Sequence, residues 1–307
     1  MGAALAPWLY QLGKWFAALA AERDFPLIFE ALGNACGRSK LGRYFSRALL
    51  LSALFLLPVL IVRIRTLRQG KPLSLMNLQR LRWQQASVHL LGGCLIAGGI
   101  LWGLVLVLKG MGAFTPAASL PSYASLLSKV VVTTLIAPLI EEFLFRGILL
   151  GLWLRVSRPL TACIGTSFVF AFLHFLAPPA DTVGVSPSAP GAGFELLGAM
   201  VFHFTELQFF ITDFATLFVV GMILAWSRVA TGSLWLAIGL HAGWIFTFKS
   251  VLLYYQAVEG HWLRPWGVGD SVRSGGLPLI CLCLTLVACH FMLRITSPAS
   301  RSSRRRS

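Results

Sequence analysis

The residues whose spacing points most directly to chemistry are two adjacent glutamates, Glu141 and Glu142, followed by Arg146. They lie between the apolar runs 130–140 and 148–154. Glu142 and Arg146 are four residues apart with the acid first, which places them on one helix face in the favourable order for an ion pair. Glu141 is turned by about 100° from Glu142. The spacing therefore predicts one carboxylate held by arginine and a second one left for acid–base chemistry.

Two histidines on later apolar segments extend this set. His174 follows Phe170 by one helical turn, and His241 lies further along the chain. Each histidine alone is a weak signal, because histidine is often a buried structural residue. Together with the two glutamates and the arginine, they supply a general base, a charge partner and two hydrogen-bond donors or ligands. The combination predicts a site that activates water.

One further polar group has the right residue types but a less informative setting. It is His203 with Glu206 and Asp213, in which the histidine and the glutamate are three residues apart. We expect a polar helix face or a loop contact here rather than a set of ligands.

The composition shows where these residues must work. Hydrophobic residues make up 57% of the 307 residues and charged residues 12%, against roughly a quarter charged in ordinary soluble chains. The formal net charge is +15, but the basic residues lie beside apolar segments, as in cytoplasmic loops that face anionic lipid. The sequence therefore predicts an integral membrane protein whose partner is the bilayer and not nucleic acid.

The hydropathy pattern predicts an all-α, multi-pass transmembrane bundle of about seven to eight spans. A span needs about 20 mostly apolar residues, and seven segments qualify: 44–62, 88–108, 122–156, 161–176, 207–227, 233–254 and 277–293. The segment 122–156 is too long for one simple span. Residues 3–21 are predicted to form an amphipathic helix at the membrane interface and are the candidate for an eighth span. The Pro- and Gly-rich run 178–193 is predicted to be a loop.

We divide the chain into four parts: an interfacial segment 1–43, N-terminal transmembrane helices 44–121, a membrane core 122–255 that carries the candidate catalytic residues, and a last helix with a basic tail 256–307. Six basic residues lie between the first two spans: Arg63, Arg65, Arg68, Lys71, Arg80 and Arg82. The positive-inside rule places that loop in the cytoplasm, and alternation then places the arginine-rich C-terminus there too. The cell (inner) membrane is the expected location. The six cysteines are not expected to form a disulfide framework.

At the chemistry-bearing residues the sequence resembles the CAAX proteases and bacteriocin-processing enzymes, the CPBP or Abi family of intramembrane proteases. The family motifs Glu-Glu-x-x-x-Arg, Phe-x-x-x-His and His-x-x-x-Asn fall on Glu141, Glu142, Arg146, Phe170, His174 and His241. Ile245 stands where the third motif often has asparagine. Each motif is short, but three in order on three predicted spans are much more specific. The resemblance covers roughly residues 122–254.

The resemblance implies an endopeptidase that acts on a membrane-associated protein or peptide. It implies that Glu141 and His174 activate the attacking water and that His241 donates to the oxyanion. Glu142 and Arg146 are expected to position this machinery, and Phe170 is expected to contact the substrate.

Ile245 leaves the predicted oxyanion site without one donor, because its side chain has no polar hydrogen. Trp244 or Thr247 would have to take the place of the asparagine. The loss of this donor keeps a second reading open, in which the protein is a non-catalytic immunity or peptide-binding protein of the same fold.

Two further alternatives remain open. In the first, Glu141, His174 and His241 relay protons or ions in a transporter, although the sequence lacks the repeats and broken spans typical of that class. The second concerns metal. We expect an enzyme without a cofactor, and the alternative is an enzyme that uses zinc. Two glutamates and two histidines are a plausible zinc set, but the chain has no His-Glu-x-x-His helix and Glu142 is predicted to be engaged by Arg146.

Overall fold

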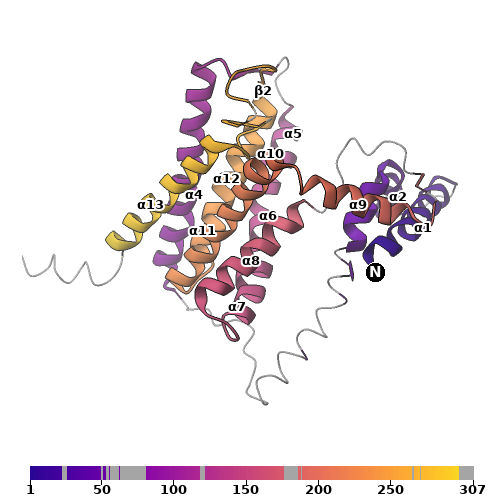
Figure 1. Ribbon diagram of the computed structural model, residues 1–307, viewed down its shortest axis with the longest axis horizontal. Helices are drawn as coiled ribbons and strands as arrows, with labels where there is room; N and C mark the ends of the chain where they lie inside the picture. Colours follow the sequence, from indigo (N-terminus) through magenta and orange to yellow (C-terminus); the bar gives the residue numbers. More distant parts are fainter. Residues whose placement is uncertain are drawn as a thin grey trace, which may run out of the picture. The chain divides into compact units, whose positions relative to one another are not determined.

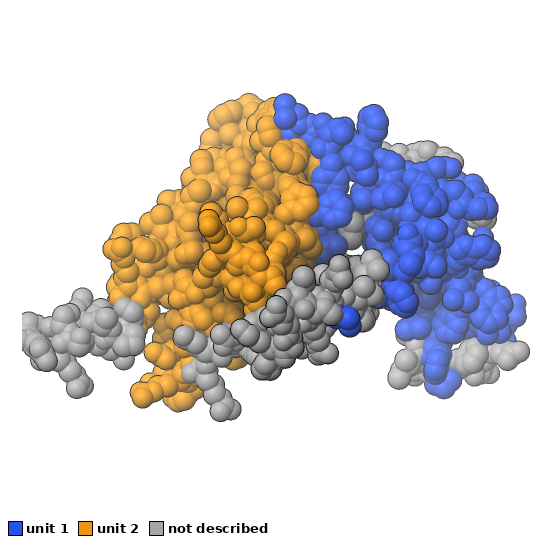
Figure 2. Space-filling model, turned by 60° about the horizontal axis from the view of Figure 1, so that its bottom comes forward, with its two compact units in different colours: residues 1–73, 172–207 blue, residues 74–171, 208–307 orange. Residues whose placement is uncertain are grey.

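The computed structural model describes residues 1–22, 26–49, 51–52, 55, 62, 81–117, 122–175, 186–187, 189–264, 266–269 and 271–296. The chain divides into two compact units, which Figure 2 distinguishes by colour. Unit 1 comprises residues 1–73 and 172–207, and unit 2 comprises residues 74–171 and 208–307. Both units are helical, so the predicted all-α class is confirmed.

Unit 1 contains α1 (Gly2–Glu22), α2 (Leu27–Arg38), the helical residues 41–49 and α9 (Ala192–His203). Helix α1 confirms the helix predicted over residues 3–21, and its interfacial location stays a prediction. α1 and α9 approach closely, because a Cβ built on Gly193 would lie 1.8 Å from the Ala3 carbonyl oxygen. Residues 178–185 and 188 of the predicted loop 178–193 lie outside the described residues. The sequence did not indicate α9.

Unit 2 is a bundle of helices with one short pair of strands (Figure 1). Its helices are α4 (Trp83–Gly110), α5 (Tyr123–Leu126), η1 (Leu127–Val132), α6 (Thr133–Glu142), η2 (Phe143–Leu149), α7 (Leu150–Trp153), α8 (Pro159–His174), α10 (Leu207–Phe209), η3 (Phe210–Phe214), α11 (Ala215–Thr231), α12 (Trp235–Tyr254) and α13 (Gly276–Thr296). The division between the units falls within two helices: residues 172–174 at the end of α8 and Leu207 at the start of α10 belong to unit 1. Strands β1 (Phe114–Pro116) and β2 (Tyr255–Ala257) pair antiparallel, with Phe114 opposite Ala257.

Four of the described helices are long and apolar enough to cross a membrane: Trp83–Gly110, Leu207–Thr231, Trp235–Tyr254 and Gly276–Thr296. They coincide with the predicted spans 88–108, 207–227, 233–254 and 277–293. The predicted span 161–176 appears as the shorter apolar helix α8. Nine of the 19 residues of the predicted span 44–62, most of the basic loop that follows it and the arginine-rich tail lie outside the described residues. The total of seven to eight spans stays a prediction.

The segment predicted as 122–156 is one uninterrupted helical run from Tyr123 to Trp153. Within it, α6 lies between two π-helical stretches, η1 and η2. Stretches of π-helix change the register of the side chains and are frequent at functional sites. Here η2 begins directly after Glu142 and contains Arg146. The change of helix type therefore occurs where the sequence places its chemistry.

Close packing of α4 against α12 fixes the position of His241. A Cβ on Gly239 would lie 2.1 Å from the Leu90 carbonyl oxygen, and one on Gly243 would lie 2.4 Å from that of Cys94. In lipid, small residues let helix backbones approach closely and gain van der Waals contact. Because these glycines flank His241, they hold its backbone directly against α4.

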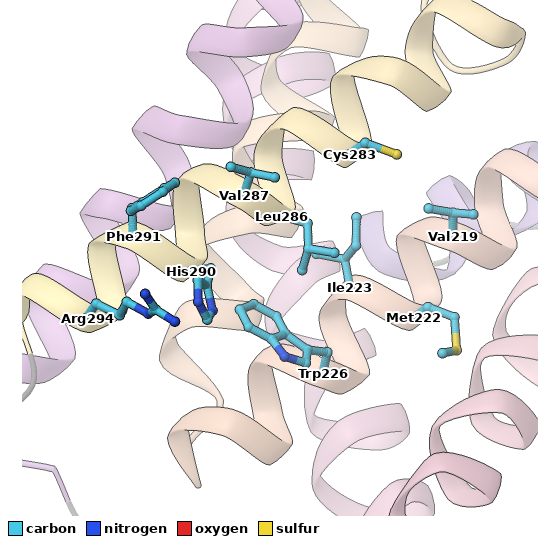
Figure 3. Close-up of a pocket in the computed structure, with 10 residues that line it drawn as sticks. All are labelled: Val219, Met222, Ile223, Trp226, Cys283, Leu286, Val287, His290, Phe291 and Arg294. Atoms are coloured by element: carbon cyan, nitrogen blue, oxygen red, sulfur yellow. The ribbon is translucent and has the colours of Figure 1, made fainter.

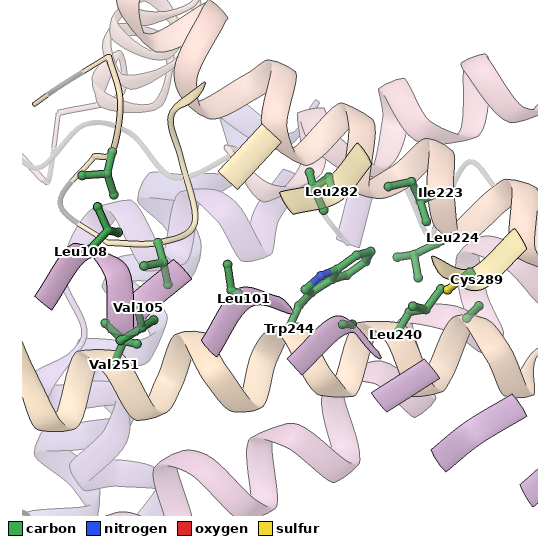
Figure 4. Packing of buried hydrophobic residues seen from close by; sticks show 14 of the residues in the cluster. Leu101, Val105, Leu108, Ile223, Leu224, Leu240, Trp244, Val251, Leu282 and Cys289 are labelled. Carbon is green, nitrogen blue, oxygen red and sulfur yellow. The ribbon is translucent and has the colours of Figure 1, made fainter. Parts of the chain in front are cut away.

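The main hydrophobic cluster of unit 2 lies where α4, α11, α12 and α13 meet (Figure 4). Its buried members include Leu101, Val105, Leu224, Leu240, Trp244 and Leu282. Phe170 of α8 also belongs to this cluster. The cluster therefore joins the helix that carries His241 to the helices that surround the site.

Candidate active site

Three charged or polar side chains from α6, η2 and α12 meet in the interior of unit 2. Arg146 donates from Nη1 to Glu142 Oε1 over 3.0 Å, and His241 Nδ1 lies 2.8 Å from the same oxygen. The exposed fractions of the Arg146, Glu142 and His241 side chains are 1%, 0% and 6%. The ion pair predicted from the spacing of Glu142 and Arg146 is confirmed. The contact with His241, which is 99 residues away in sequence, was not predicted.

Glu141 lies on the other side of the same imidazole ring. Its Oε2 is 3.8 Å from His241 Nε2, and its side chain is 30% exposed. A carboxylate only accepts hydrogen bonds, so the Nδ1 atom of His241 carries the proton shared with Glu142. Nε2 is then directed at Glu141 at a distance too long for a direct hydrogen bond. The two adjacent glutamates thus face the two nitrogens of one histidine.

Arg146 is anchored by more than its carboxylate. Its Nη2 donates to the Gly221 carbonyl oxygen of α11 over 3.2 Å. The guanidinium carbon also lies 4.3 Å from the centre of the Phe170 ring and 5.7 Å from that of Phe145. A guanidinium over an aromatic face is attracted by the ring quadrupole. Arg146 therefore links its own helical run to α8 and α11.

Phe170 packs inside this arrangement, and its exposed fraction is 1%. Its ring makes edge-to-face contacts with Phe145 at 5.2 Å and with His241 at 6.0 Å. The ring thus contacts both the arginine and the histidine of the site. Its predicted contact with substrate stays a prediction, and its observed contacts are with the charged network.

Gly221 is a member of the site that sequence reasoning missed. A Cβ at this position would lie 2.9 Å from the Cβ of Ser167 on α8. Only glycine lets α11 come this close to α8 while its carbonyl reaches Arg146. Nothing in the sequence separates Gly221 from the other glycines of the apolar helices, because its role depends on a contact with a residue 75 positions away.

The residues near the missing asparagine have other partners. The Thr247 hydroxyl donates to the Gly98 carbonyl oxygen of α4 over 3.2 Å, so its single hydrogen is already engaged. Trp244 is 8% exposed and belongs to the main hydrophobic cluster (Figure 4). Ile245 lies one helical turn after His241 on α12. His241 is therefore the residue of this motif that can still donate to a reacting oxygen.

The remaining predicted residues are distributed as follows. His174 is the last residue of α8 and falls in unit 1, whereas Glu141, Glu142, Arg146 and His241 fall in unit 2. The participation of His174 stays a prediction.

All six cysteines are free in the described structure, as predicted.

The polar group predicted to be a surface contact is split. His203 Nδ1 pairs with Glu206 Oε1 at 3.2 Å, with side chains 33% and 62% exposed. Asp213 instead accepts a hydrogen bond from Thr212 and lies 4.0 Å from Arg273. These three residues are polar surface contacts and do not form a ligand set.

Zinc stays an alternative for this donor set. Zinc sites use at least three protein ligands, and among the described residues no three or more His, Cys, Asp or Glu side chains are grouped to hold a metal ion. Glu142 Oε1 is already shared by a guanidinium and an imidazole. The residues that meet here are arranged as a hydrogen-bonded network.

A pocket of about 420 Å³ adjoins the site along α6. Its lining comes from one helical run and consists of Val132, Thr133, Ile136, Ala137, Ile140 and Glu141. Glu141 is the ionisable residue in this lining, at the end nearest His241. An apolar segment lying in this pocket would therefore meet the Glu141 carboxylate.

Residues 122–247 match the family model described as Type II CAAX prenyl endopeptidase, Rce1-like. The predicted resemblance to the CPBP family is confirmed. We call residues 122–247 the Rce1-like segment. It contains all three motifs and the complete Glu142–Arg146–His241 network. The match supports a membrane endopeptidase of the CAAX-protease type, and with the four apolar helices it supports an integral membrane protein. Comparisons with curated proteins and with solved structures gave no match.

Proposed function

We propose that this protein is an intramembrane endopeptidase in which Glu141 and His241 act together on a peptide bond of a membrane-associated protein or peptide. One observation carries the proposal. Within the Rce1-like segment, His241 is held at Nδ1 by the buried Glu142 and presents Nε2 to Glu141. A base and a hydrogen-bond donor thus lie side by side at the edge of a pocket.

The charges of the site support this assignment. Glu141, Glu142 and Arg146 together carry one net negative charge. Burying unbalanced charge is costly, and a proton on Nε2 of His241 brings the sum to zero. In that state Nδ1–H donates to Glu142 and Nε2–H is available to an oxygen that develops negative charge. The network thereby preorganises a donor, which is an effective way to stabilise a tetrahedral intermediate.

The proposed reaction needs no covalent intermediate. Glu141 takes a proton from water while the water oxygen attacks the peptide carbonyl carbon. The carbonyl oxygen becomes an oxyanion that accepts a hydrogen bond from His241 Nε2. Glu141 then delivers its proton to the amide nitrogen as the carbon–nitrogen bond breaks. His174, the histidine of the second motif, is proposed to assist Glu141 in activating the water.

The supporting residues have separate tasks in this proposal. Glu142 fixes the orientation of His241, and Arg146 pairs with the Glu142 carboxylate. Phe170 and the Gly221 carbonyl hold Arg146. Because Glu142 and Arg146 are almost fully buried, they position the reacting groups and do not meet the substrate.

The membrane orientation is also a proposal. Five arginines lie at one end of unit 2: Arg82 before α4, Arg155 and Arg158 between α7 and α8, Arg228 in the last turn of α11, and Arg294 in the last turn of α13. The described part of the opposite end carries three basic residues, Lys109, Arg264 and Arg273. The helix ends can be followed in Figure 1. We call the end with the five arginines the basic end. By the positive-inside rule it faces the cytoplasm of the cell membrane, together with the C-terminus. His241 lies six residues into α12, about 9 Å from that end.

The test compares membranes that contain the wild type with membranes that contain Glu141→Gln. Mass spectrometry of membrane-associated peptides identifies the chain termini in each sample. We expect termini that appear with the wild type and are absent with Glu141→Gln, because the amide cannot accept the proton. The matched control is Glu259→Gln, which changes an exposed glutamate of unit 2 and should leave the termini unchanged.

Identical termini in wild type and Glu141→Gln, with both proteins folded and inserted, would overturn the proposal. That outcome favours the non-catalytic peptide-binding reading, for which Ile245 in the place of asparagine is the supporting observation.

A further inference from the structure

We propose that the groove between α11 and α13 is a binding site for an anionic phospholipid. The groove has a volume of about 720 Å³. Among the described residues, its lining comes from these two helices: Val219, Met222, Ile223, Trp226, Cys283, Leu286, Val287, His290, Phe291 and Arg294 (Figure 3). The residues of the proposed peptidase site do not contribute to it.

Most of the groove suits a hydrocarbon chain. Its two helices are both long and apolar enough to cross a membrane, so the groove runs along the depth of the bilayer. Val287 and Phe291 on its α13 side are 52% and 57% exposed. Such exposure of apolar side chains on a membrane span places them against lipid tails. The geometry therefore fits an acyl chain lying between the helices.

One end of the groove differs from the rest. His290 and Arg294 are four residues apart on α13 and share one face, and Trp226 of α11 lies across from them in Figure 3. Cys283 and Val219 lie at the opposite end of the same view. Tryptophan is enriched where membrane meets water, because its ring is apolar and its N–H is polar. An indole, an imidazole and a guanidinium together form a set of donors for a lipid headgroup.

The charge at this end selects the kind of headgroup. Arg294 belongs to the basic end, where Arg228 lies in the last turn of α11. The segments 226–236 and 290–296 contain no aspartate or glutamate, so these two described segments offer no carboxylate to the cationic group of a zwitterionic lipid. Basic pockets between membrane helices on the cytoplasmic side bind anionic headgroups. The groove is thus apolar along the bilayer and cationic at the membrane surface.

The experiment uses the full-length protein, stripped of co-purified lipid in detergent. Native mass spectrometry then measures the binding of phosphatidylglycerol and of phosphatidylcholine with identical acyl chains. We expect phosphatidylglycerol to bind more tightly than phosphatidylcholine. Because one basic residue near the surface contributes about 1 kcal/mol, Arg294→Gln should weaken phosphatidylglycerol binding about five-fold. His290→Gln together with Arg294→Gln should remove the preference.

Matched variants separate the groove from the general charge of the protein. Arg158→Gln removes an exposed arginine of the basic end outside the groove and should keep the preference. Val287→Trp fills the groove and should lower the binding of both lipids. Leu284 has a similar exposure, 53%, and lies outside the lining of the groove. Leu284→Trp therefore adds the same ring without filling the groove and should leave the binding of both lipids unchanged. Equal binding of the two lipids by the wild type would overturn the proposal, as would an equal loss in Arg158→Gln and Arg294→Gln.

Discussion

Two histidine–glutamate pairs in this protein use the same atoms in different surroundings. His241 Nδ1 lies 2.8 Å from Glu142 Oε1, with side chains 6% and 0% exposed. His203 Nδ1 lies 3.2 Å from Glu206 Oε1, with side chains 33% and 62% exposed. Water competes for the second pair and screens it, whereas burial excludes water from the first.

The difference lies in the neighbours and not in the pair itself. The buried pair has a second carboxylate at Nε2, a guanidinium on its own carboxylate and an aromatic ring beside the imidazole. The exposed pair joins residues three positions apart on one stretch of chain. A histidine and a glutamate become a candidate site when distant elements fix their geometry, and the following variants test that statement.

The largest expected effect comes from removing the cation of the buried network. Arg146→Met leaves the Glu142 carboxylate buried beside His241 without its charge partner. Breaking a buried ion pair in this way costs about 3–5 kcal/mol of stability, so the unfolding temperature in detergent should fall steeply. The matched change is Arg273→Met, which removes an arginine 48% exposed and 4.0 Å from Asp213. Its effect should be below about 1 kcal/mol, and equal losses in the two variants would contradict the account.

Glu142→Gln tests whether the buried carboxylate orients the imidazole. The amide no longer balances the charge on a protonated His241, so the donor at Nε2 loses its fixed position. Because a positioned acid or base contributes at least about 10²-fold, cleavage should slow by that factor or more while substrate binding changes little. The comparison is Glu206→Gln, the same change in the exposed pair, which should leave the rate unchanged. Unaltered cleavage in Glu142→Gln would remove this residue from the site.

Gly221→Ala tests the backbone carbonyl that holds Arg146. The added Cβ would meet Ser167 at 2.9 Å, and overpacking of this kind costs about 1–3 kcal/mol. We expect a lower unfolding temperature and slower cleavage. Gly103→Ala is the matched control, because a Cβ at Gly103 has no atom within 4 Å. An equally well tolerated change at both positions would show that α11 does not depend on close contact with α8.

The smallest expected effect is that of a chelator. Among the described residues, no three or more His, Cys, Asp or Glu side chains are grouped to hold a metal ion, so cleavage should continue after treatment with 1,10-phenanthroline. Loss of activity that added Zn²⁺ restores, with the fold intact, would instead support the zinc alternative.

The local part of the site follows from sequence, and the part that connects distant elements does not. Helical spacing was sufficient to predict the ion pair of Glu142 and Arg146, since both lie on one helical run. The contacts of this pair with His241 and with the Gly221 carbonyl depend on how α11 and α12 pack, which no spacing encodes. Apolar runs likewise located the long helices, whereas the π-helical stretch η2 has no periodic signal that could have predicted it.

The central claim is that Glu141 and His241 act as one catalytic unit. The most direct test measures the cleavage rate in proteoliposomes for the wild type, Glu141→Gln, His241→Ala and the double variant, using a substrate identified from its new termini. If the two residues serve one transition state, the double variant should be no slower than the slower single variant, because residues that act as a unit are strongly non-additive. Rate losses that multiply in the double variant would show independent roles, and full activity in Glu141→Gln would contradict the account.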